Sequence, residues 1–287
     1  MLIKLSAVAL FVVFGLLHAD PANWTPFIPP AEKTADGGTA FGIPGVLAAA
    51  GMVFFAFLGF DAMATTALEA RNPQRDLPRT IIATLAISTL LYMLVGLTMT
   101  GLVNYRQLNV DAPITAALAA AGPSLAWVKS YVGIAVSIGL WAGLWAAFYA
   151  ISRLIYMLAG DGWLPSVLTH LSPQSRIPVR AVVTVGVVGA VLAAFMPIAL
   201  LGELISTGAL LAFTVVCAAV FSLRRRQPER ARPFRIPYGQ AIAILGVVTS
   251  LGLIASMGGW AIVRILTWQA LGIPLVLLAL RRKSAGS

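Results

Sequence analysis

Long apolar segments dominate this chain and limit what it can fold into. Eight of them can be delimited, and most are long enough to cross a lipid bilayer as a helix, which takes about 20 residues. Joints rich in proline, glycine or charged residues separate them, for example NYRQLNVDAP and RRRQPERARPFRIPYG. The segments cover residues 1–18, 44–68, 80–103, 130–158, 180–196, 199–222, 240–257 and 260–280.

The composition agrees with a membrane protein. Hydrophobic residues make up 59% of the chain and charged residues 10%, whereas soluble domains carry about 25% charged residues. The apolar runs are unbroken, and transmembrane strands would instead alternate over about ten residues. We therefore predict an all-α, polytopic membrane protein with about eight transmembrane helices, folded as a single transmembrane domain over residues 1–287.

The basic residues are distributed unevenly between the joints. If the first segment runs outward, fourteen Lys and Arg fall in inner joints and three in outer joints. Lys and Arg accumulate on the cytoplasmic side of membrane proteins. The net charge of +10 therefore indicates topology, with a cytoplasmic C-terminus and inner-leaflet lipid contact as a secondary interpretation. It argues against nucleic-acid binding.

Residues that could support metal or enzyme chemistry are sparse. Cys217 is the single cysteine, and His18 and His170 lie in different segments without ligand-like spacing. This excludes a disulfide within the chain and a cysteine-based zinc site. Paired acids, a Ser–His pair or metal ligands at membrane depth are not visible either. We expect no metal, no cofactor and no enzymatic activity.

The first segment is short for a span. Met1–Leu17 extends about 25 Å as a helix, with Lys4 near its inner end. One interpretation is a signal peptide; the other is a span that lacks its first turns because the chain is a fragment. HADPANW is a poor cleavage site for a signal peptide. We favour the fragment, because of the family resemblance described below.

The second segment carries an unexpected carboxylate, Asp61, two residues after Gly59. A charge inside a bilayer costs about 2.5–3.5 kcal/mol, so such residues usually face a cavity and a partner. If the helix unwinds around Leu58–Gly59, the freed backbone groups can bind a substrate ammonium or carboxylate. The alternative is that residues 44–60 form most of the span and Asp61 caps a short cytosolic helix.

Two joints carry further local predictions. Asn72-Pro73 and Leu77-Pro78 should prevent a continuous helix in the joint after the second segment. Residues 111–122, DAPITAALAAAG, begin with Asp and Pro and end with Gly. This pattern predicts a short outer helix with Asp111 as its N-cap.

Several stretches together resemble one family of membrane proteins. FFAFLGFDAMATTALEARNPQRDLPRTI resembles the sixth span and following loop of the amino acid–polyamine–organocation (APC) superfamily, in its cationic amino acid transporter-like branch. ANWTPFIP, SRLIYMLAGDGWLP, GELISTGALLAFTVVC and RPFRIP resemble other parts of that family, in matching order. The resemblance implies a secondary amino acid transporter of the plasma (inner) membrane, sodium-independent and either proton-coupled or exchanging.

The resemblance implies only part of that family's fold. These transporters have about twelve spans with two inverted five-helix repeats, a leucine-transporter-like fold. The first segment here resembles the fifth span, and the others resemble spans six to twelve. We therefore expect a partial inverted-repeat fold that lacks the first four spans, does not transport alone and has the missing N-terminal spans as partner. The alternative is a truncated non-catalytic fragment, or a half-transporter that needs a partner chain.

The resemblance also implies a substrate site at the break in the second segment. Backbone carbonyls of Phe55, Ala56 and Leu58 would hold the substrate's α-ammonium group where Gly59 interrupts the helix. Phe55 and Phe57 would form a wall or gate, and Asp61 would orient the broken segment. Which amino acid binds is left open, because members of the family with different substrates share this motif.

Other site residues come from outside that segment. Phe148 would line the side-chain pocket, although helix packing explains it equally well. The resemblance implies that Lys4, in the context LIKL, couples transport to a proton, with its ammonium group in the place that a sodium ion occupies in sodium-driven relatives. Without the resemblance, Lys4 would be interpreted as a residue at the end of a span that extends its side chain to the cytosolic interface. Glu203 and Arg264 are interpreted as structural residues near the outer interface.

Overall fold

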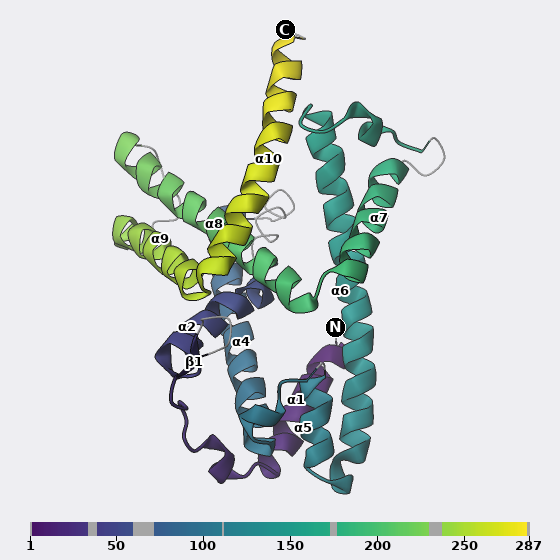
Figure 1. Ribbon diagram of the computed structural model, residues 1–287, viewed down its shortest axis with the longest axis vertical. Helices are drawn as coiled ribbons and strands as arrows, with labels where there is room; N and C mark the ends of the chain where they lie inside the picture. The colour runs from purple at the N-terminus through teal and green to yellow at the C-terminus, as the bar shows by residue number, and fades with distance from the viewer. Residues whose placement is uncertain are drawn as a thin grey trace. The chain divides into compact units, whose positions relative to one another are not determined.

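The computed structural model describes residues 2–33, 39–59, 72–110, 112–172, 177–229 and 237–285. These residues are predominantly helical (Figure 1), which confirms the predicted all-α class. The α-helices are α1 (Leu2–Leu17), α2 (Gly42–Val53), α4 (Pro73–Leu102), α5 (Pro113–Ala120), α6 (Ala126–Gly160), α7 (Val179–Phe195), α8 (Ile198–Arg226), α9 (Gly239–Ser256) and α10 (Gly259–Ala285).

Short elements connect these helices. The 3-10 helices are η1 (Pro21–Trp24), η2 (Phe54–Phe57), η4 (Tyr105–Gln107), η5 (Pro123–Leu125) and η6 (Ser166–Thr169). Two strands of two residues each, β1 (Glu32–Lys33) and β2 (Thr39–Ala40), pair antiparallel with Glu32 opposite Ala40.

Several helices have the length and composition of membrane spans. In the described part of the chain, four are long and apolar enough to cross a bilayer: Gln74–Leu102, Pro123–Gly160, Ile198–Arg226 and Gly239–Ser256. Leu2–Leu17, Gly42–Phe57 and Val179–Phe195 are apolar but shorter. These helices agree with a polytopic membrane protein, and the count of eight spans stays a prediction.

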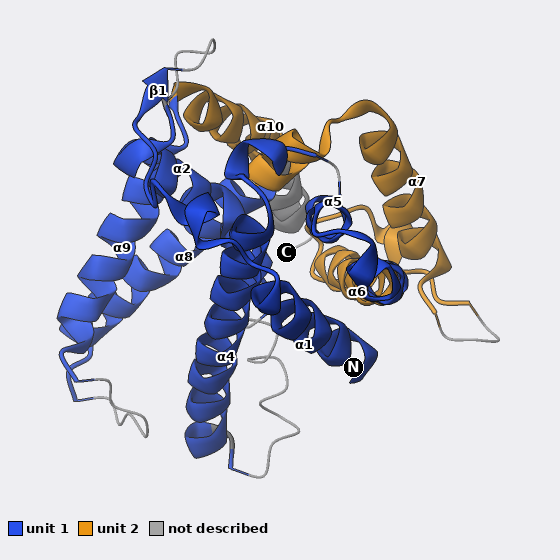
Figure 2. Ribbon diagram, turned by 90° about the horizontal axis from the view of Figure 1, so that it is seen from below, with its two compact units in different colours: residues 1–137, 205–258 blue, residues 138–204, 259–287 orange. Residues whose placement is uncertain are grey.

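The described helices fall into two compact units (Figure 2). The first contains residues 1–137 and 205–258, and the second contains residues 138–204 and 259–287. The chain passes from one unit to the other within α6 and within α8. The prediction of a single transmembrane domain stays a prediction.

The buried core of the first unit lies where α1 packs against α4 and α5. Phe11 of α1 and Leu118 of α5 are 2% and 0% exposed. Gly15 allows the close approach of α1 to α4, because a Cβ at this position would overlap the methyl group of Thr98. Thr98 is itself fully buried. This core holds α4 in place, and α4 contributes one side of the candidate site.

The prediction of a helix break at Leu77-Pro78 is wrong, whereas the one at Asn72-Pro73 agrees with the structure, because Asn72 is non-helical and α4 begins after it. Pro73 is the first residue of α4, and Pro78 lies inside the helix. A proline at the first helical position loses no intrahelical hydrogen bond, because the N–H there has no partner in any helix. Pro78 deprives only the Gln74 carbonyl of an i→i−4 donor, and Gln74 is exposed. The helix therefore starts at Pro73 and continues through Pro78.

The predicted outer helix is present as α5, but its N-cap prediction is wrong. The N-cap is Ala112, without a side-chain cap bond, and Pro113 occupies the first turn. Asp111 lies outside the described residues. The helix is held instead by burial, since Ala117 and Leu118 are both 0% exposed. Gly122 follows the helix with a φ of 105°, a conformation that favours glycine.

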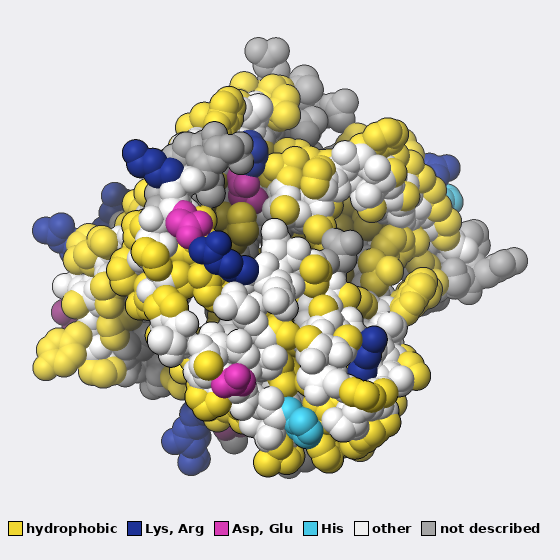
Figure 3. Space-filling model, turned by 60° about the horizontal axis from the view of Figure 1, so that its bottom comes forward, with side chains coloured by type: hydrophobic (Ala, Val, Ile, Leu, Met, Phe, Trp, Pro, Cys, Tyr) yellow, Lys and Arg dark blue, Asp and Glu magenta, His cyan; other side chains and the backbone are white. Residues whose placement is uncertain are grey.

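Large apolar side chains cover much of the molecular surface. Figure 3 shows hydrophobic side chains over much of one face, with charged groups scattered among them. On α6, Leu140 is 70% exposed and Trp145 is 69% exposed. Exposed apolar surface on this scale marks contact with lipid or with other protein segments. It agrees with helices that lie in a membrane.

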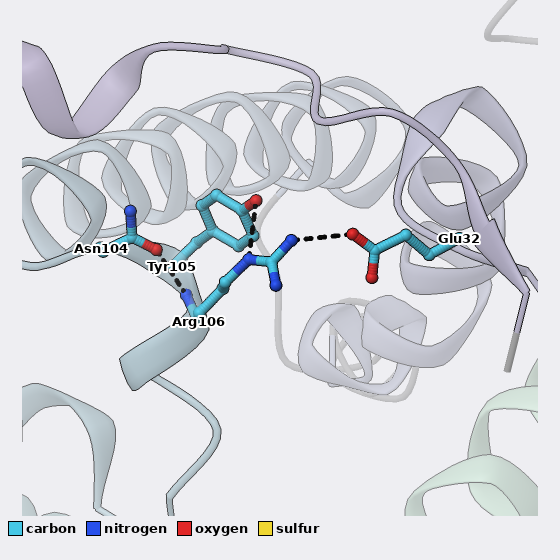
Figure 4. A network of polar contacts seen from close by, with 4 residues as sticks. All are labelled: Glu32, Asn104, Tyr105 and Arg106. Carbon is cyan, nitrogen blue, oxygen red and sulfur yellow. Dashed lines mark hydrogen bonds and ion pairs between the residues drawn. The ribbon is translucent and has the colours of Figure 1, made fainter.

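One polar cluster ties the short hairpin to the turn after α4 (Figure 4). Arg106 Nη2 lies 2.8 Å from Glu32 Oε1, and Arg106 Nε donates a hydrogen bond to Tyr105 Oη over 3.3 Å. The Arg106 backbone N–H donates to Asn104 Oδ1. The hydrogen bond to Tyr105, followed by the charge of Glu32, raises the pKa of Arg106 above its usual value. The pair is exposed, and the Arg106 guanidinium group stays protonated at neutral pH.

Candidate functional site

The apolar helix of the second segment stops being α-helical before Gly59. It ends at Val53 and continues as the 3-10 helix η2. Leu58 is extended, with φ −60° and ψ 139°, and Gly59 has a φ of 117°. The hydrogen bonds shorten accordingly: Phe54 N–H donates to Gly51 O and Leu58 N–H to Phe55 O, both i→i−3. The departure from helical geometry predicted at Leu58–Gly59 is confirmed. That this is a break within a span, rather than the end of the span before a helix capped by Asp61, stays a prediction, because residues 60–71 lie outside the described residues.

A serine hydroxyl from α8 bridges the junction between α2 and η2. Ser206 Oγ donates a hydrogen bond of 2.7 Å to Met52 O. The same oxygen accepts one of 3.3 Å from the Phe55 N–H. In a continuous α-helix, Met52 O would accept from Ala56 N–H and Phe55 N–H would donate to Gly51 O. The hydroxyl thus satisfies backbone groups that the break leaves without these partners.

A tyrosine hydroxyl from α4 binds the other side of η2. Tyr92 Oη donates a hydrogen bond of 2.8 Å to Ala56 O. The Tyr92 ring also packs edge-on against Phe57, with centroids 5.3 Å apart and planes at 81°. Both contacts lie within the first unit.

A small cavity of about 160 Å³ opens between η2 and α4. Ala56, Phe57, Leu58 and Gly59 line it from the break, and Thr84, Leu85, Ser88 and Tyr92 line it from α4. At about 30 Å³ per water molecule, its volume is that of about five waters. It therefore has room for a small polar group.

α2 is fixed on α9 by close backbone contact. A Cβ at Gly51 would lie 2.8 Å from Met257 Cγ and 3.1 Å from Leu253 O. Phe54 packs edge-on against Phe213 of α8, with centroids 5.8 Å apart. The broken segment is therefore held by α4, α8 and α9 together.

The predicted substrate-binding carbonyls lie at the break, and two of them already accept hydrogen bonds. Phe55 O accepts from Leu58 N–H, and Ala56 O accepts from Tyr92 Oη. A carbonyl oxygen has two lone pairs, so each can accept a second donor. The Phe55 and Leu58 side chains are 48% and 41% exposed, whereas Phe57 is half-buried.

The structure gives no position relative to η2 for two predicted site residues. Asp61 lies outside the described residues, so its role stays a prediction. Phe148 lies in the second unit, where its ring packs on Gly186 of α7. A Cβ at Gly186 would lie 3.4 Å from Phe148 Cζ. This contact agrees with the packing interpretation of Phe148, and its role in a pocket stays a prediction.

Lys4, the predicted coupling residue, is exposed in the first turn of α1. Neither of the two ion pairs among the described residues involves it. Two residues along α1, Ser6 Oγ lies 2.7 Å from Tyr131 Oη of α6, and Phe14 packs edge-on against Trp127. Lys4 thus belongs to a helix packed on the first part of α6, and its coupling role stays a prediction.

Glu203 and Arg264, predicted as structural residues, form an ion pair between α8 and α10. Arg264 Nη1 lies 2.6 Å from Glu203 Oε2. The Glu203 side chain is 11% exposed and that of Arg264 is 43% exposed. Removing one partner of a buried pair is costly, because it leaves a charge without its compensation.

We expect Arg264→Gln to lower the thermal unfolding midpoint by about 2–8 °C. The basis is a cost of about 1–2 kcal/mol, reduced from the buried-pair value because Arg264 is partly exposed, at about 2–4 °C per kcal/mol. Arg106→Gln is the matched control, since the Arg106–Glu32 pair is 2.8 Å long but 62% and 47% exposed. The control should leave the midpoint unchanged. Equal shifts for the two variants would mean that burial of the Arg264–Glu203 pair does not add to stability.

The sequence prediction did not identify Ser206 and Tyr92. Both lie within apolar runs, in GELISTGALL and TLLYMLVG. A polar side chain inside an apolar span usually finds a partner on a neighbouring helix, and this signal could have marked them. Their partner atoms, 151 to 154 and 36 residues away, could not have been read from such a signal.

The chemistry available at the break is that of neutral hydrogen-bonding groups. Carbonyl oxygens, N–H groups and hydroxyls lie close together there, and groups of these kinds can bind an ammonium or a carboxylate group without a fixed charge. Among the described residues, no group of three or more His, Cys, Asp or Glu lies close enough to hold a metal ion.

Comparison with known proteins relates the chain to transporters. A family model described as amino acid permease matches residues 1–274. The methylthioribose transporter of Bacillus subtilis (strain 168) is 34% identical over 283 residues, which cover 99% of this chain and 59% of that protein. The branched-chain amino acid permease BcaP of the same organism is 34% identical over 284 residues, covering 99% and 58%.

A plant relative matches a smaller part of the chain. The vacuolar cationic amino acid transporter 4 of Arabidopsis thaliana is 36% identical over 227 residues, which cover 79% of this chain and 37% of that protein. The chain spans about three fifths of the length of the two bacterial relatives. All three relatives are permeases or transporters rather than enzymes.

Proposed function

Because this chain belongs to the amino acid permease family, we propose that it acts in secondary transport of amino acids across a membrane. The resemblance seen in the sequence motifs is thereby confirmed at the level of the family. Activity and substrate remain proposals for this chain, because the bacterial relatives are longer proteins of which it matches about three fifths.

The observation that supports an amino acid substrate is the broken helix. η2 and Leu58 present backbone carbonyls and N–H groups at a point where a membrane helix would normally satisfy them internally. The carbonyls of Phe55, Ala56 and Leu58 bind the α-ammonium group, and Gly59 provides the break. Phe57 and Phe148 contact the substrate side chain, and Asp61 orients the segment beyond Gly59.

The coupling proposal rests on Lys4 and on the distribution of charge. Transport is sodium-independent and either proton-coupled or exchanging, with Lys4 as the coupling residue. The fourteen basic residues of the inner joints support a plasma (inner) membrane protein with a cytoplasmic C-terminus. We further propose that transport requires spans equivalent to those that the longer relatives carry beyond the matched part, in the same polypeptide or in a partner chain.

Ligand-dependent thermal stability of the purified chain in detergent tests the substrate class. Each of the twenty amino acids and methylthioribose are added separately. A ligand that binds only the folded protein stabilises it by about 2.7 kcal/mol at a hundred times its Kd. We expect at least one amino acid to raise the unfolding midpoint by several degrees, and Asp61→Asn to abolish this shift.

The outcomes separate the substrate classes. Methylthioribose has neither an ammonium nor a carboxylate group. If it alone stabilises the chain, the substrate is methylthioribose and not an amino acid. Absence of any shift would contradict binding by this chain. A shift that Asp61→Asn leaves intact would remove Asp61 from the site while retaining the amino acid substrate.

A further inference from the structure

We propose that Ser206 and Tyr92 are positioning residues that hold η2 in its open, non-α-helical form. The inference rests on the proposed function, because it assigns these residues to the amino acid site. It adds two side chains from helices α8 and α4 to a site otherwise built from one segment.

The first step of the argument is the bonding of Ser206. Its hydroxyl is a donor to Met52 O and an acceptor from Phe55 N–H, and its side chain is 0% exposed. A buried hydroxyl that both donates to and accepts from the same backbone turn restrains that turn at two atoms. The two backbone groups are three residues apart, so the hydroxyl stands where an i→i−3 bond would join them.

The second step is the bonding of Tyr92. Its hydroxyl donates to Ala56 O over 2.8 Å, and its ring is braced by Phe57 at 5.3 Å. A donor at this carbonyl orients one lone pair toward α4 and leaves the second lone pair for another donor. The Tyr92 ring also lines the cavity beside Leu58 and Gly59.

The third step compares the two anchors. Ser206 acts on Met52 and Phe55 at the start of η2, and Tyr92 acts on Ala56 and Phe57 near its end. They come from different helices, α8 and α4, so η2 is held from both. Without them, the freed backbone groups would be satisfied most easily by return to α-helical bonding, because a span leaves such groups no water.

The consequence for the site concerns recognition of the ammonium group. The carbonyls of Phe55 and Ala56 accept a substrate ammonium only while η2 keeps its geometry. Loss of either hydroxyl therefore weakens binding of α-amino acids more than binding of analogues without the ammonium group. A purely structural role would weaken both equally.

The test uses Ser206→Ala and Tyr92→Phe in the full 287-residue chain. Each removes one oxygen atom, and Tyr92→Phe keeps the ring contact with Phe57. The matched controls are Thr214→Val on α8 and Thr89→Val on α4, whose hydroxyls bond only to carbonyls of their own helices. Folding of every variant is checked by gel filtration and circular dichroism.

Two measurements are made on each variant. Hydrogen exchange of the peptide spanning residues 52–58 reports on η2 without any ligand. Affinity is measured for every amino acid that stabilises the unmodified chain, and for the α-hydroxy acid with the same side chain. We expect Ser206→Ala to slow exchange at Phe55, because its N–H would regain the α-helical bond to Gly51 O. We expect each site variant to lower the preference for the amino acid over the hydroxy acid about three- to tenfold.

The results distinguish this inference from the proposed function. If the unmodified chain binds no amino acid, the proposed function fails and the substrate role of the two hydroxyls fails with it. If it binds amino acids and the preference is unchanged in both variants, the positioning role alone is overturned. Unchanged exchange at residues 52–58 in Ser206→Ala, or equal effects in the threonine controls, would also overturn it.

Discussion

Gly59→Ala is expected to lower amino acid affinity about tenfold or more while leaving the protein folded. Gly59 has a φ of 117°, which residues with a Cβ adopt only at a cost of about 1–3 kcal/mol. In the described part of the chain, no atom lies within 4 Å of the position a Cβ would take. The effect therefore comes from backbone conformation and not from a clash.

The size of the loss follows from the population of the open form. An apparent Kd rises in proportion as the binding-competent conformation becomes rarer, and about 1.4 kcal/mol corresponds to a factor of ten. Isothermal titration with the amino acid that binds the unmodified chain measures the change. Alanine also favours a regular helix over glycine by about 1 kcal/mol, which acts in the same direction.

The matched control is Gly96→Ala in α4, a helical glycine with open space around its Cβ position. It should leave the affinity unchanged. Unchanged affinity in Gly59→Ala as well would contradict the requirement for a glycine at the break. It would also weaken the assignment of the substrate site to η2.

Gly51→Val is expected to lower the thermal unfolding midpoint by about 2–12 °C. Its Cβ would lie 2.8 Å from Met257 Cγ, 3.0 Å from Met257 Sδ and 3.1 Å from Leu253 O. Overpacking of this kind typically costs about 1–3 kcal/mol, at about 2–4 °C per kcal/mol. The Leu253 carbonyl is backbone and cannot rotate away, so α2 must move from α9.

A second substitution separates the two contacts. Met257→Ala removes the flexible side chain but leaves the Leu253 carbonyl, so it should restore part of the midpoint in the Gly51→Val background. Gly252→Ala in α9, where a Cβ meets nothing within 4 Å, is the control and should not lower the midpoint. A midpoint unaffected by Gly51→Val would mean that α2 and α9 do not pack through this glycine.

The family and the membrane character could be predicted from local patterns. Apolar segments, their joints and the run from Phe54 to Thr80 are properties of the residues in order, and they needed no knowledge of packing. The break around Leu58–Gly59 was also predictable, because glycine and the neighbouring carboxylate interrupt an apolar helix in a recognisable way. Asp61 and the roles of Lys4 and Phe148 stay predictions.

The errors arose where local rules were applied too strictly. Pro78 was expected to end a helix, but α4 contains it because the lost hydrogen bond belongs to an exposed carbonyl near the helix start. Asp111 was expected to cap α5, but Ala112 does so, and the helix is held by burial of Ala117 and Leu118. At Pro78 the loss of one hydrogen bond does not end the helix, and at α5 burial outweighs the lack of a side-chain N-cap, which is worth about 1 kcal/mol.

The order of residues by itself determined that this chain forms apolar helices, that one of them breaks before Asp61, and which family it belongs to. Hydrophobic length and backbone preference act between near neighbours, so they can be read directly from that order. Only the tertiary structure decided that Ser206 and Tyr92 meet the break. A hydrogen bond between residues 36 or 151 positions apart depends on how helices pack, and packing has no signature in any single segment.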